Sequence, residues 1–523
     1  MYDMVIKGGW VIPGDGPGYP ADIAVQGTII AAVAPNLSAN LASSMVDAHG
    51  LWICPGFIDM HAHSALRSFT HPLLEPKIAQ GFTTEVIHPD GLAPAPVKPS
   101  QREARHRYLR PLEGPGPDSW TWETLPQFLE TLDATHPTTT LVPSVGHNAV
   151  REYVMGNTNR EPTPRELQAM ADEVEREIEA GARMLSFGLI YLPGVYAQTE
   201  ELIALARVAA RHAVPLMPHI RNEGEGILSA LTEMIDVARL SGASLHLSHL
   251  KLVGSSNLLD ALLTLLDKAS RDIDLTFDQY PYGAGSTLLT AILPPWALDG
   301  GVASILTRLR DPHMRSRIRH DIVEGIPGWE NLYRACGPSH ITIADAPSSH
   351  AIILGHSLRE LGLKRNQDPL DAVLDLLEES ALDVAMIDHY ATDEVVKAIF
   401  RHPLALVGTD GIFGAHPHPR LYGTAAKVLG QYALRDHLIS PEDAVARLTS
   451  RAADRLHLKD RGRILKGLRA DLVLLDPKKY TNKATFAKPR QYPSGIEMVF
   501  IAGQPVWAHN APTEIRPGGV LGF

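Results

Sequence analysis

Four histidines and one aspartate stand at or near the ends of apolar runs, where a polar side chain is costly unless it has a function. His61 and His63 are two residues apart, so on a strand both side chains point to the same face. His219, His249 and Asp410 close three further apolar runs. Each alone is more often a satisfied core or rim residue than a ligand. Together, four neutral imidazoles and one carboxylate form a ligand set suited to Zn²⁺ or a similar divalent ion.

Eight short apolar runs between residues 55 and 412 are the strand candidates that would position these side chains. Amphipathic helical stretches separate them, and one of these begins with Thr163, Pro164 and Glu166 in a capping-box pattern. Eight strands alternating with helices fit an α/β fold, a parallel (β/α)₈ TIM-like barrel, whose chemistry sits at the C-terminal ends of the strands. All five candidate ligands fall at such ends. The strand candidates are GFIDMHAH, TTEVIH, TTLVPSV, MLSFGLI, PLMPHI, SLHLSHL, DLTFDQYPY and LALVGTD.

The sequence outside the strand candidates predicts further structural units. Residues 1–54 and 461–523 alternate short apolar runs with Gly, Pro and Asn, so we expect both termini to form one small β-sandwich domain. Residues 55–460 would form the metal-dependent barrel. About 288–347 is expected to be an inserted lid subdomain with helices of its own, placed where it can cover the barrel mouth. The stretch 92–122 is rich in Pro, Gly and Arg and is expected to be a long loop.

Composition narrows the class of partner. The chain has 523 residues, 45% hydrophobic and 20% charged, which is typical of a soluble globular protein. A net charge of -11 without a basic stripe argues against nucleic acid and anionic membranes, so we expect a small-molecule substrate. Two cysteines, no signal-peptide pattern and no 18-residue apolar run favour a cytoplasmic protein without a membrane span. Homo-oligomerisation stays open.

A series of motifs, in order along essentially the whole chain, resembles the amidohydrolase superfamily and, within it, the N-acyl-D-amino-acid deacylases (D-aminoacylases). Each motif is modestly specific, and the ordered series is strong. The motifs are PGFIDMHAHS, GFTTEVIHPDG, HIRNEGEGI, LSHLKLVG, DQYPYGAGST, GTDG, PHPRLYGT, KGLRADLVLLDP and YPSGIEMVFIAGQPVW.

The resemblance implies a metal-dependent hydrolase in which His61, His63, His219 and His249 bind one or two metal ions, and Asp410 contacts both metal and water. A divalent ion such as Zn²⁺ lowers the pKa of bound water from about 16 toward 7, giving hydroxide at neutral pH, and polarises the amide carbonyl. Asp410 can then take the proton from that water and return it to the departing nitrogen. The alternative for Asp410 is a strand-end aspartate that caps the turn in TDG.

Asp90 is the least orthodox position. In the deacylases that the chain resembles, this position of GFTTEVIHPDG is usually a cysteine whose thiolate binds the tightly held metal, and here there is no such cysteine. A carboxylate is also a competent ligand and could occupy or bridge the same site, although it binds Zn²⁺ less tenaciously than a thiolate. His88 is a candidate substitute or added partner. The remaining alternative is that Pro89, Asp90 and Gly91 only form a turn.

Other amidohydrolases bridge their metals with a carboxylated lysine on a middle strand. This chain has no lysine between Lys98 and Lys251, so that device is absent from the third to fifth strands. Dihydroorotase and hydantoinase relatives of the usual kind are therefore disfavoured.

Substrate recognition follows from the resemblance. Lys251, Tyr282 and Arg420 match residues that hold the substrate's carboxylate in those enzymes, and an arginine fork with lysine and tyrosine donors is a sound anion clamp. Arg221 and Glu223 lie just past the fifth strand, where they are expected to support the metal ligands.

We therefore predict an amidohydrolase acting on non-peptide C–N bonds, which cleaves N-acyl-D-amino acids or similar N-acyl compounds by a metal-activated hydroxide. One alternative is a hydrolase of a cyclic amide, carbamate or peptide-like substrate on the same core. Another is a catalytically silent amidohydrolase-like binding protein. Five of the six expected ligand positions are intact and the sixth carries another ligand type, which favours the enzyme.

Overall fold

Parallel strands in the middle of the chain form two sheets in the computed structural model, which describes residues 1–522. In the first, β6 (Phe57–Ala62), β7 (Phe82–Ile87) and β8 (Thr140–Pro143) pair in parallel, and β22 (Gly519–Val520) adds to the free side of β8. Every residue of β6, β7 and β8 is buried. Parallel strands covered on both faces read as continuous apolar runs, which explains the sequence signal.

The second parallel sheet has six strands. Its order is β17-β13-β12-β11-β10-β9, and a parallel bridge between Ala62 and Gly411 joins the two sheets beside β6. Each of the eight predicted strand segments therefore contains a strand, and the fold is α/β. The strands of this sheet are β9 (Val145–Gly146), β10 (Leu185–Gly188), β11 (Leu216–His219), β12 (Leu245–Leu247), β13 (Leu275–Gln279) and β17 (Ala405–Val407).

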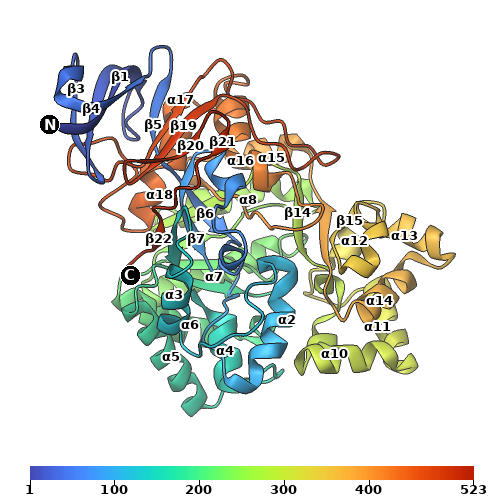
Figure 1. Cartoon of the computed structure of the whole chain (residues 1–523). Coiled ribbons are helices and arrows are strands. Elements are labelled where there is room, and N and C mark those ends of the chain that lie inside the picture. Colours follow the sequence, from blue (N-terminus) through green and yellow to red (C-terminus); the bar gives the residue numbers. More distant parts are fainter. Residues whose placement is uncertain (523) are drawn as a thin grey trace.

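Helices connect these strands and pack their apolar sides against them (Figure 1). The predicted capping box is confirmed at α5 (Pro164–Glu179), where the Thr163 hydroxyl accepts a hydrogen bond from the Glu166 amide. Among residues 1–522, none of the helices is long and apolar enough to cross a membrane. The other helices around the parallel strands are α1 (Glu75–Ile78), α3 (Leu125–Asp133), α4 (His147–Met155), α6 (Thr199–Arg211), α7 (Ile227–Ser241), α8 (Leu259–Ala269), α15 (Asp393–Phe400), α16 (Arg420–Ala425), α17 (Pro441–Leu448) and α18 (Ser450–Arg455).

The expectation of a long loop over 92–122 is wrong in part, because the segment contains the helix α2 (Arg102–Glu113). Its buried side includes charged residues as well as apolar ones. Arg105 is buried and forms an ion pair with Glu152, and Glu113 is completely buried. Charged residues on the inner side blur the apolar stripe that normally marks an amphipathic helix.

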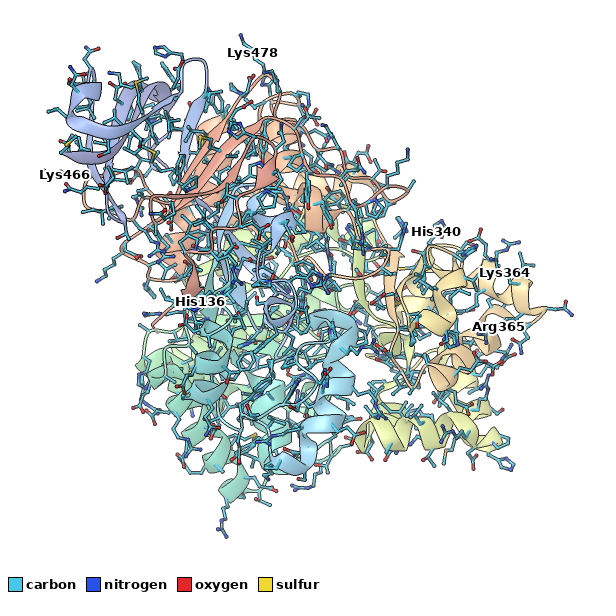
Figure 2. All side chains as sticks on the ribbon, viewed as in Figure 1. His136, His340, Lys364, Arg365, Lys466 and Lys478 are labelled. Carbon is cyan, nitrogen blue, oxygen red and sulfur yellow. The ribbon has the colours of Figure 1, made fainter. Side chains whose placement is uncertain are left out.

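Between β13 and β17 the chain leaves the parallel strands and folds as helices around a small antiparallel sheet, drawn in yellow and orange in Figure 1. The sheet has the order β14-β16-β15, from β14 (Ala284–Leu288), β15 (Ile341–Asp345) and β16 (Ala385–His389). Lys364 and Arg365 lie on the outer side of this helical segment (Figure 2). The helices are α9 (Pro295–Leu298), α10 (Gly301–Arg310), α11 (Pro312–Glu324), α12 (Leu332–Cys336), α13 (Leu358–Arg365) and α14 (Pro369–Glu379).

A nine-stranded sheet combines strands from both ends of the chain, which appear as blue and red ribbons beside one another in Figure 1. The two ends meet where β5 (Trp52–Pro55) pairs antiparallel with β18 (Leu472–Leu475). Since β6 begins two residues after β5, this sheet is tied directly to the strand that carries His61. Its other strands are β1 (Tyr2–Val11), β2 (Tyr19–Gln26), β3 (Ile29–Ala34), β4 (Ala42–Asp47), β19 (Ile496–Ile501), β20 (Gln504–Ala508) and β21 (Ala511–Pro512).

Candidate metal centre and active site

The ends of β6, β7 and β17 bring four predicted ligands together. His61 lies on β6 and His63 just beyond it, Asp90 follows β7, and Asp410 follows β17. His61 Nε2 is 3.3 Å from Asp90 Oδ2 and 3.6 Å from Asp410 Oδ1, and His63 Nε2 is 3.5 Å and 3.3 Å from the same two oxygens. All four side chains are buried. They form one group whose ligand atoms could surround a single ion.

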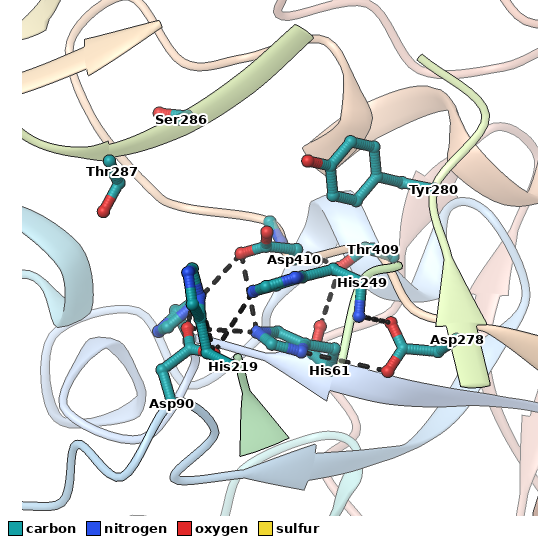
Figure 3. A network of polar contacts seen from close by, with 12 residues as sticks. His61, Asp90, His219, His249, Asp278, Tyr280, Ser286, Thr287, Thr409 and Asp410 are labelled. Atoms are coloured by element: carbon teal, nitrogen blue, oxygen red, sulfur yellow. Dashed lines mark hydrogen bonds and ion pairs between the residues drawn. The ribbon is translucent and has the colours of Figure 1, made fainter. Parts of the chain in front are cut away.

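A second group lies on the other side of Asp90. His219 at the end of β11 places Nδ1 3.6 Å from Asp90 Oδ1, and His249 beyond β12 places Nε2 3.3 Å from the same atom. The two carboxylate oxygens of Asp90 thus face two different pairs of histidines, of which Figure 3 labels His61, His219 and His249. This geometry favours the bridging alternative for Asp90 over a simple turn.

The donor atoms fit a divalent metal. His61 Nε2, His219 Nδ1 and Asp90 Oδ1 are buried and have no hydrogen-bond partner anywhere in residues 1–522. Unpartnered buried polar atoms are rare because each costs free energy. Here they converge on one another from the ends of separate strands. Imidazole nitrogens and carboxylate oxygens are common Zn²⁺ ligands, so one or two ions would satisfy these atoms.

The backbone at these positions is strained. His88, Asp90, His249 and Asp410 have φ angles of 63°, 58°, 32° and 47°, in the left-handed region. Such residues cluster at functional sites, where the surrounding structure holds them in place. The abrupt end of VIHPDG is therefore the bend that turns Asp90 toward the histidines.

A hydrogen bond from a neighbouring helix orients His63. Its Nδ1 lies 2.8 Å from Oε1 of Glu113, the last residue of α2. This contact leaves Nε2 to face Asp90 and Asp410. A carboxylate on the far nitrogen of a metal-binding histidine fixes the ring and increases its basicity. Sequence reasoning missed Glu113 because it lies in the segment expected to be a loop.

A buried network beneath the site joins β6 to β17. Asp59 Oδ1 accepts hydrogen bonds from the backbone amides of His61 (3.2 Å) and Thr409 (2.7 Å). Lys77 donates to Asp59 Oδ2 at 2.6 Å and to the Thr409 hydroxyl at 2.7 Å. The network holds His61 and Asp410, which follows Thr409, in register with one another.

Asp410 also forms an ion pair with Arg420, whose Nη2 is 3.0 Å from Oδ1. Burial alone would raise the pKa of this carboxyl, but Arg420 and the histidines hold the pKa of Asp410 well below its ordinary value. Burial likewise opposes the charge of Asp90, yet the imidazoles of His61 and His249 hold its pKa well below the usual range. Both carboxyl groups are therefore ionised at neutral pH, as metal ligands must be.

Two of the three predicted substrate-binding residues line the cavity at this site, and the third does not. Lys251 and Arg420 line it together with Tyr280. The substrate-binding role of Tyr282 stays a prediction, but its side chain lies outside this cavity, where the Asn482 amide donates to its hydroxyl at 3.3 Å. The reason is that β13 ends at Gln279, and the bend that follows separates the two tyrosines.

Of the two residues expected to support the metal ligands just past β11, Glu223 contacts one of them and Arg221 does not. Glu223 lies 3.2 Å from His249 Nδ1 and 2.7 Å from Lys251 Nζ. Burial opposes its charge, but Lys251 and the imidazoles lower the pKa of Glu223 to about 2. Arg221 instead binds Glu233 at 2.8 Å and does not contact the ligands.

His88 is not a metal ligand in this arrangement. Its Nδ1 lies 3.1 Å from the Ser144 carbonyl oxygen, its ring packs against Phe128, and burial lowers its pKa to about 4. It belongs to none of the ligand groups found among residues 1–522. The alternative that His88 replaces the family cysteine therefore has no support in this arrangement.

The cavity is narrow. Its volume is about 30 Å³, roughly what one water molecule needs. A neighbouring cavity of about 280 Å³ shares Ile190, Glu330 and Leu332 with it. Sequence reasoning missed Glu330 and Asp388, which also line the narrow cavity, because both come from the segment between β13 and β17 and no motif marks them.

Comparisons with known proteins agree with the geometry. The amidohydrolase family model matches residues 44–291 and 358–507. An N-acyl-D-glutamate deacylase of Alcaligenes xylosoxydans xylosoxydans is 34% identical over 99% of this chain and 96% of its own length, and a D-aminoacylase of the same organism is 32% identical over 99% and 97%. The crystal structure of N-acyl-D-glutamate deacylase from Bordetella bronchiseptica, complexed with zinc and a phosphonate mimic of the tetrahedral intermediate, superposes with a TM-score of 0.84 at 31% identity, covering 99% of both chains.

Proposed function

The chain belongs to the amidohydrolase family, and from this premise we propose that it hydrolyses the amide bond of N-acyl-D-amino acids at a centre of one or two divalent metal ions. The observation that carries the proposal is the Asp90 carboxylate, whose two oxygens face two groups of buried ligands. Full-length similarity to N-acyl-D-glutamate deacylase and D-aminoacylase supports the substrate class.

Zinc is the metal that these donors fit. His61, His63 and Asp410 would hold an ion on one side of Asp90, and His219 and His249 would hold one on the other. When bound, a divalent ion lowers the pKa of water from about 16 toward 7 and polarises a carbonyl oxygen. The protein excludes bulk water by burying every ligand.

Asp410 is the group that moves the proton. Its carboxylate takes a proton from the attacking water and returns it to the departing nitrogen, so a C–O bond forms, the C–N bond breaks, and a carboxylate and an amine leave. Arg420 keeps Asp410 ionised and fixes its orientation. Without the returned proton the nitrogen would be a very poor leaving group.

Arg420 and Lys251 are also placed to bind the substrate's own carboxylate, with Tyr280 beside them. Arg420 uses Nη2 for Asp410 and the Ser286 carbonyl, whereas its buried Nε and Nη1 have no hydrogen-bond partner in the described chain. Each of these two donors can form a charge-assisted hydrogen bond with a substrate carboxylate. The predicted anion clamp is therefore proposed for Lys251, Tyr280 and Arg420.

We also propose the finer architecture. The parallel bridge at Ala62 and the short step from β8 to β9 support closure of both parallel sheets into one eight-stranded barrel over residues 55–460. The sheet shared by the termini supports a small β domain from 1–54 and 461–523. The segment around 288–347 would act as the lid subdomain of the barrel, since Glu330 and Leu332 line the cavity.

A substrate panel tests the proposed function. Zinc-loaded protein is assayed for release of free amino acid from N-acetyl-D-amino acids and their L forms, and for ring opening of hydantoins and dihydropyrimidines. We expect hydrolysis of the D compounds. Ring opening without release of any amino acid from N-acetyl compounds would replace the proposal with a cyclic amidase.

A further inference from the structure

The cavity at the metal centre carries an excess of acidic groups. Five carboxyl groups line it, whereas the permanently charged basic side chains are one lysine and one arginine, beside three histidines. Three of the carboxyl groups form ion pairs with basic side chains, and the other two form none within the described residues. The partnered ones are Asp90 among the histidines, Asp410 with Arg420, and Glu223 with Lys251. Asp388 and Glu330 are the two that remain.

Asp388 lies on β16 and faces the cavity across β14. In the sheet it pairs with Gly285, which also lines the cavity, and a Cβ atom added to Gly285 would come within 2.9 Å of Asp388 Oδ1. The glycine therefore leaves the space that the carboxylate occupies. Asp388 is 4% exposed, and no side chain of residues 1–522 forms a hydrogen bond or ion pair with it. Burial raises its pKa to about 7.

Glu330 reaches the same cavity from the loop before α12. Its Oε1 accepts a hydrogen bond from the Glu223 amide at 2.6 Å, while its buried Oε2 has no partner within the described residues. Burial, with the nearby Glu223 charge, raises the pKa of Glu330 to about 8, and Asp388 adds to the effect. The charges of Lys251 and Arg420 offset part of the effect of burial on Asp388, but neither forms an ion pair with it. A bound cation would stabilise the charged forms of both acids.

We propose that the substrate's side chain carries a cationic group, an ammonium or a guanidinium, that binds between Asp388 and Glu330. The proposal rests on the proposed function and names its substrate class as N-acyl-D-amino acids with a basic side chain. Leu112, Ile190, Val253 and Leu332 line the cavity and provide apolar contacts for a methylene stem. An acidic substrate side chain would instead add a negative charge beside two acidic groups.

The orientation follows from the rest of the site. Arg420 and Lys251 take the substrate's α-carboxylate, and each is already neutralised by its own acid. The two remaining acids are therefore free to pair with the side chain. Ile190, Glu330 and Leu332 border the wider neighbouring cavity, which gives a long basic side chain room beyond Glu330.

A comparison of matched substrates tests this inference on the intact zinc-loaded protein. We compare kcat/KM for N-acetyl-D-lysine, N-acetyl-D-norleucine, which has a neutral side chain of similar length, and N-acetyl-D-glutamate. Charge-assisted hydrogen bonds predict that the lysine compound exceeds the norleucine compound by about 10- to 100-fold. Equal or faster hydrolysis of the norleucine or glutamate compound overturns the inference and leaves the proposed function standing. Failure to hydrolyse any of the three compounds contradicts both the inference and the proposed function.

Variants then locate the preference. Asp388→Asn and Glu330→Gln remove a charge with little change of shape, and Gln can still accept the Glu223 amide hydrogen bond. Each should reduce the lysine-to-norleucine ratio of kcat/KM toward one. Glu177→Gln is the matched control, because Glu177 is a buried, unpartnered carboxyl group outside the cavity, and it should keep the wild-type ratio. An unchanged ratio in both cavity variants contradicts the inference. If these variants do not fold, the wild-type comparison alone decides it.

Discussion

The substitution Asp90→Asn separates a bridging carboxylate from a turn-forming one. In the wild type, Oδ2 faces His61 and His63 while Oδ1 faces His219 and His249. An amide has one oxygen and a nitrogen that donates, so it can serve only one of the two groups. In excess zinc we therefore expect the variant to bind one ion fewer per chain than the wild type.

The remaining ligands decide which ion is lost. His61, His63 and Asp410 still supply three protein ligands, the number usual at catalytic zinc sites. The other position retains only His219 and His249, so its ion should be released.

The backbone explains why asparagine is preferred to alanine as the test. The φ angle of Asp90 is 58°, a left-handed conformation that Asp and Asn tolerate. Alanine at that angle adds a strain of about 1–2 kcal/mol, which would lower stability whatever the role of the carboxylate. Thermal unfolding in a chelator should therefore show Asp90→Ala less stable than Asp90→Asn.

The assay is metal per chain by elemental analysis after gel filtration. Asp90→Cys should have the opposite effect on bound zinc, because a thiolate is a softer ligand and should hold zinc more tightly than the carboxylate does. If Asp90→Asn and Asp90→Ala both retain the wild-type stoichiometry, Asp90 only forms a turn and the bridging geometry has no role in metal binding.

Three further predictions follow from buried carboxyl groups. Asp410→Asn should keep the fold and much of the metal but reduce kcat by about 10² to 10⁴, the usual contribution of a general acid or base; retention of more than half the turnover would show that another group carries the proton. Glu113→Gln should weaken zinc affinity or activity by about 10- to 100-fold through His63, as measured by competition with a chelator, and an unchanged affinity would contradict its role in orienting that ring. Burial without partners raises the pKa of Glu177 well above its ordinary value. The unfolded chain therefore loses this proton at a lower pH than the folded chain does, and the contribution of Glu177 to wild-type stability falls as pH rises above about 4.3. Glu177→Gln should therefore raise the unfolding midpoint more at pH 8 than at pH 5, and an equal rise at both would be inconsistent with this titration.

The metal ligands could be predicted because their signal is local. His61 and His63 alternate on one strand face, and polar residues that close apolar runs are conspicuous in sequence. Asp90 was ambiguous for the opposite reason, since VIHPDG is compatible with a turn as well as a ligand. Only the left-handed backbone and the contacts of Asp90 with residues at the ends of β11 and β12 turn its two oxygens to separate histidine pairs.

Other features depend on tertiary contacts that no short pattern contains. Glu113 lies on a helix whose buried side includes charged residues, so 92–122 resembled a loop. Tyr280 and Tyr282 are equivalent on an ideal strand, and the end of β13 at Gln279 decides between them. Asp388 reaches the cavity through an antiparallel pairing with β14 that lies outside the pattern of parallel strands.

Zinc titration of the chelated protein tests the central claim most directly. Hydrolysis of an N-acetyl-D-amino acid and bound metal per chain are measured together as zinc is returned. The account predicts no turnover without metal, because the water is activated only at the metal centre, and recovery by the time one or two ions bind per chain. Full activity in a metal-free preparation would contradict it.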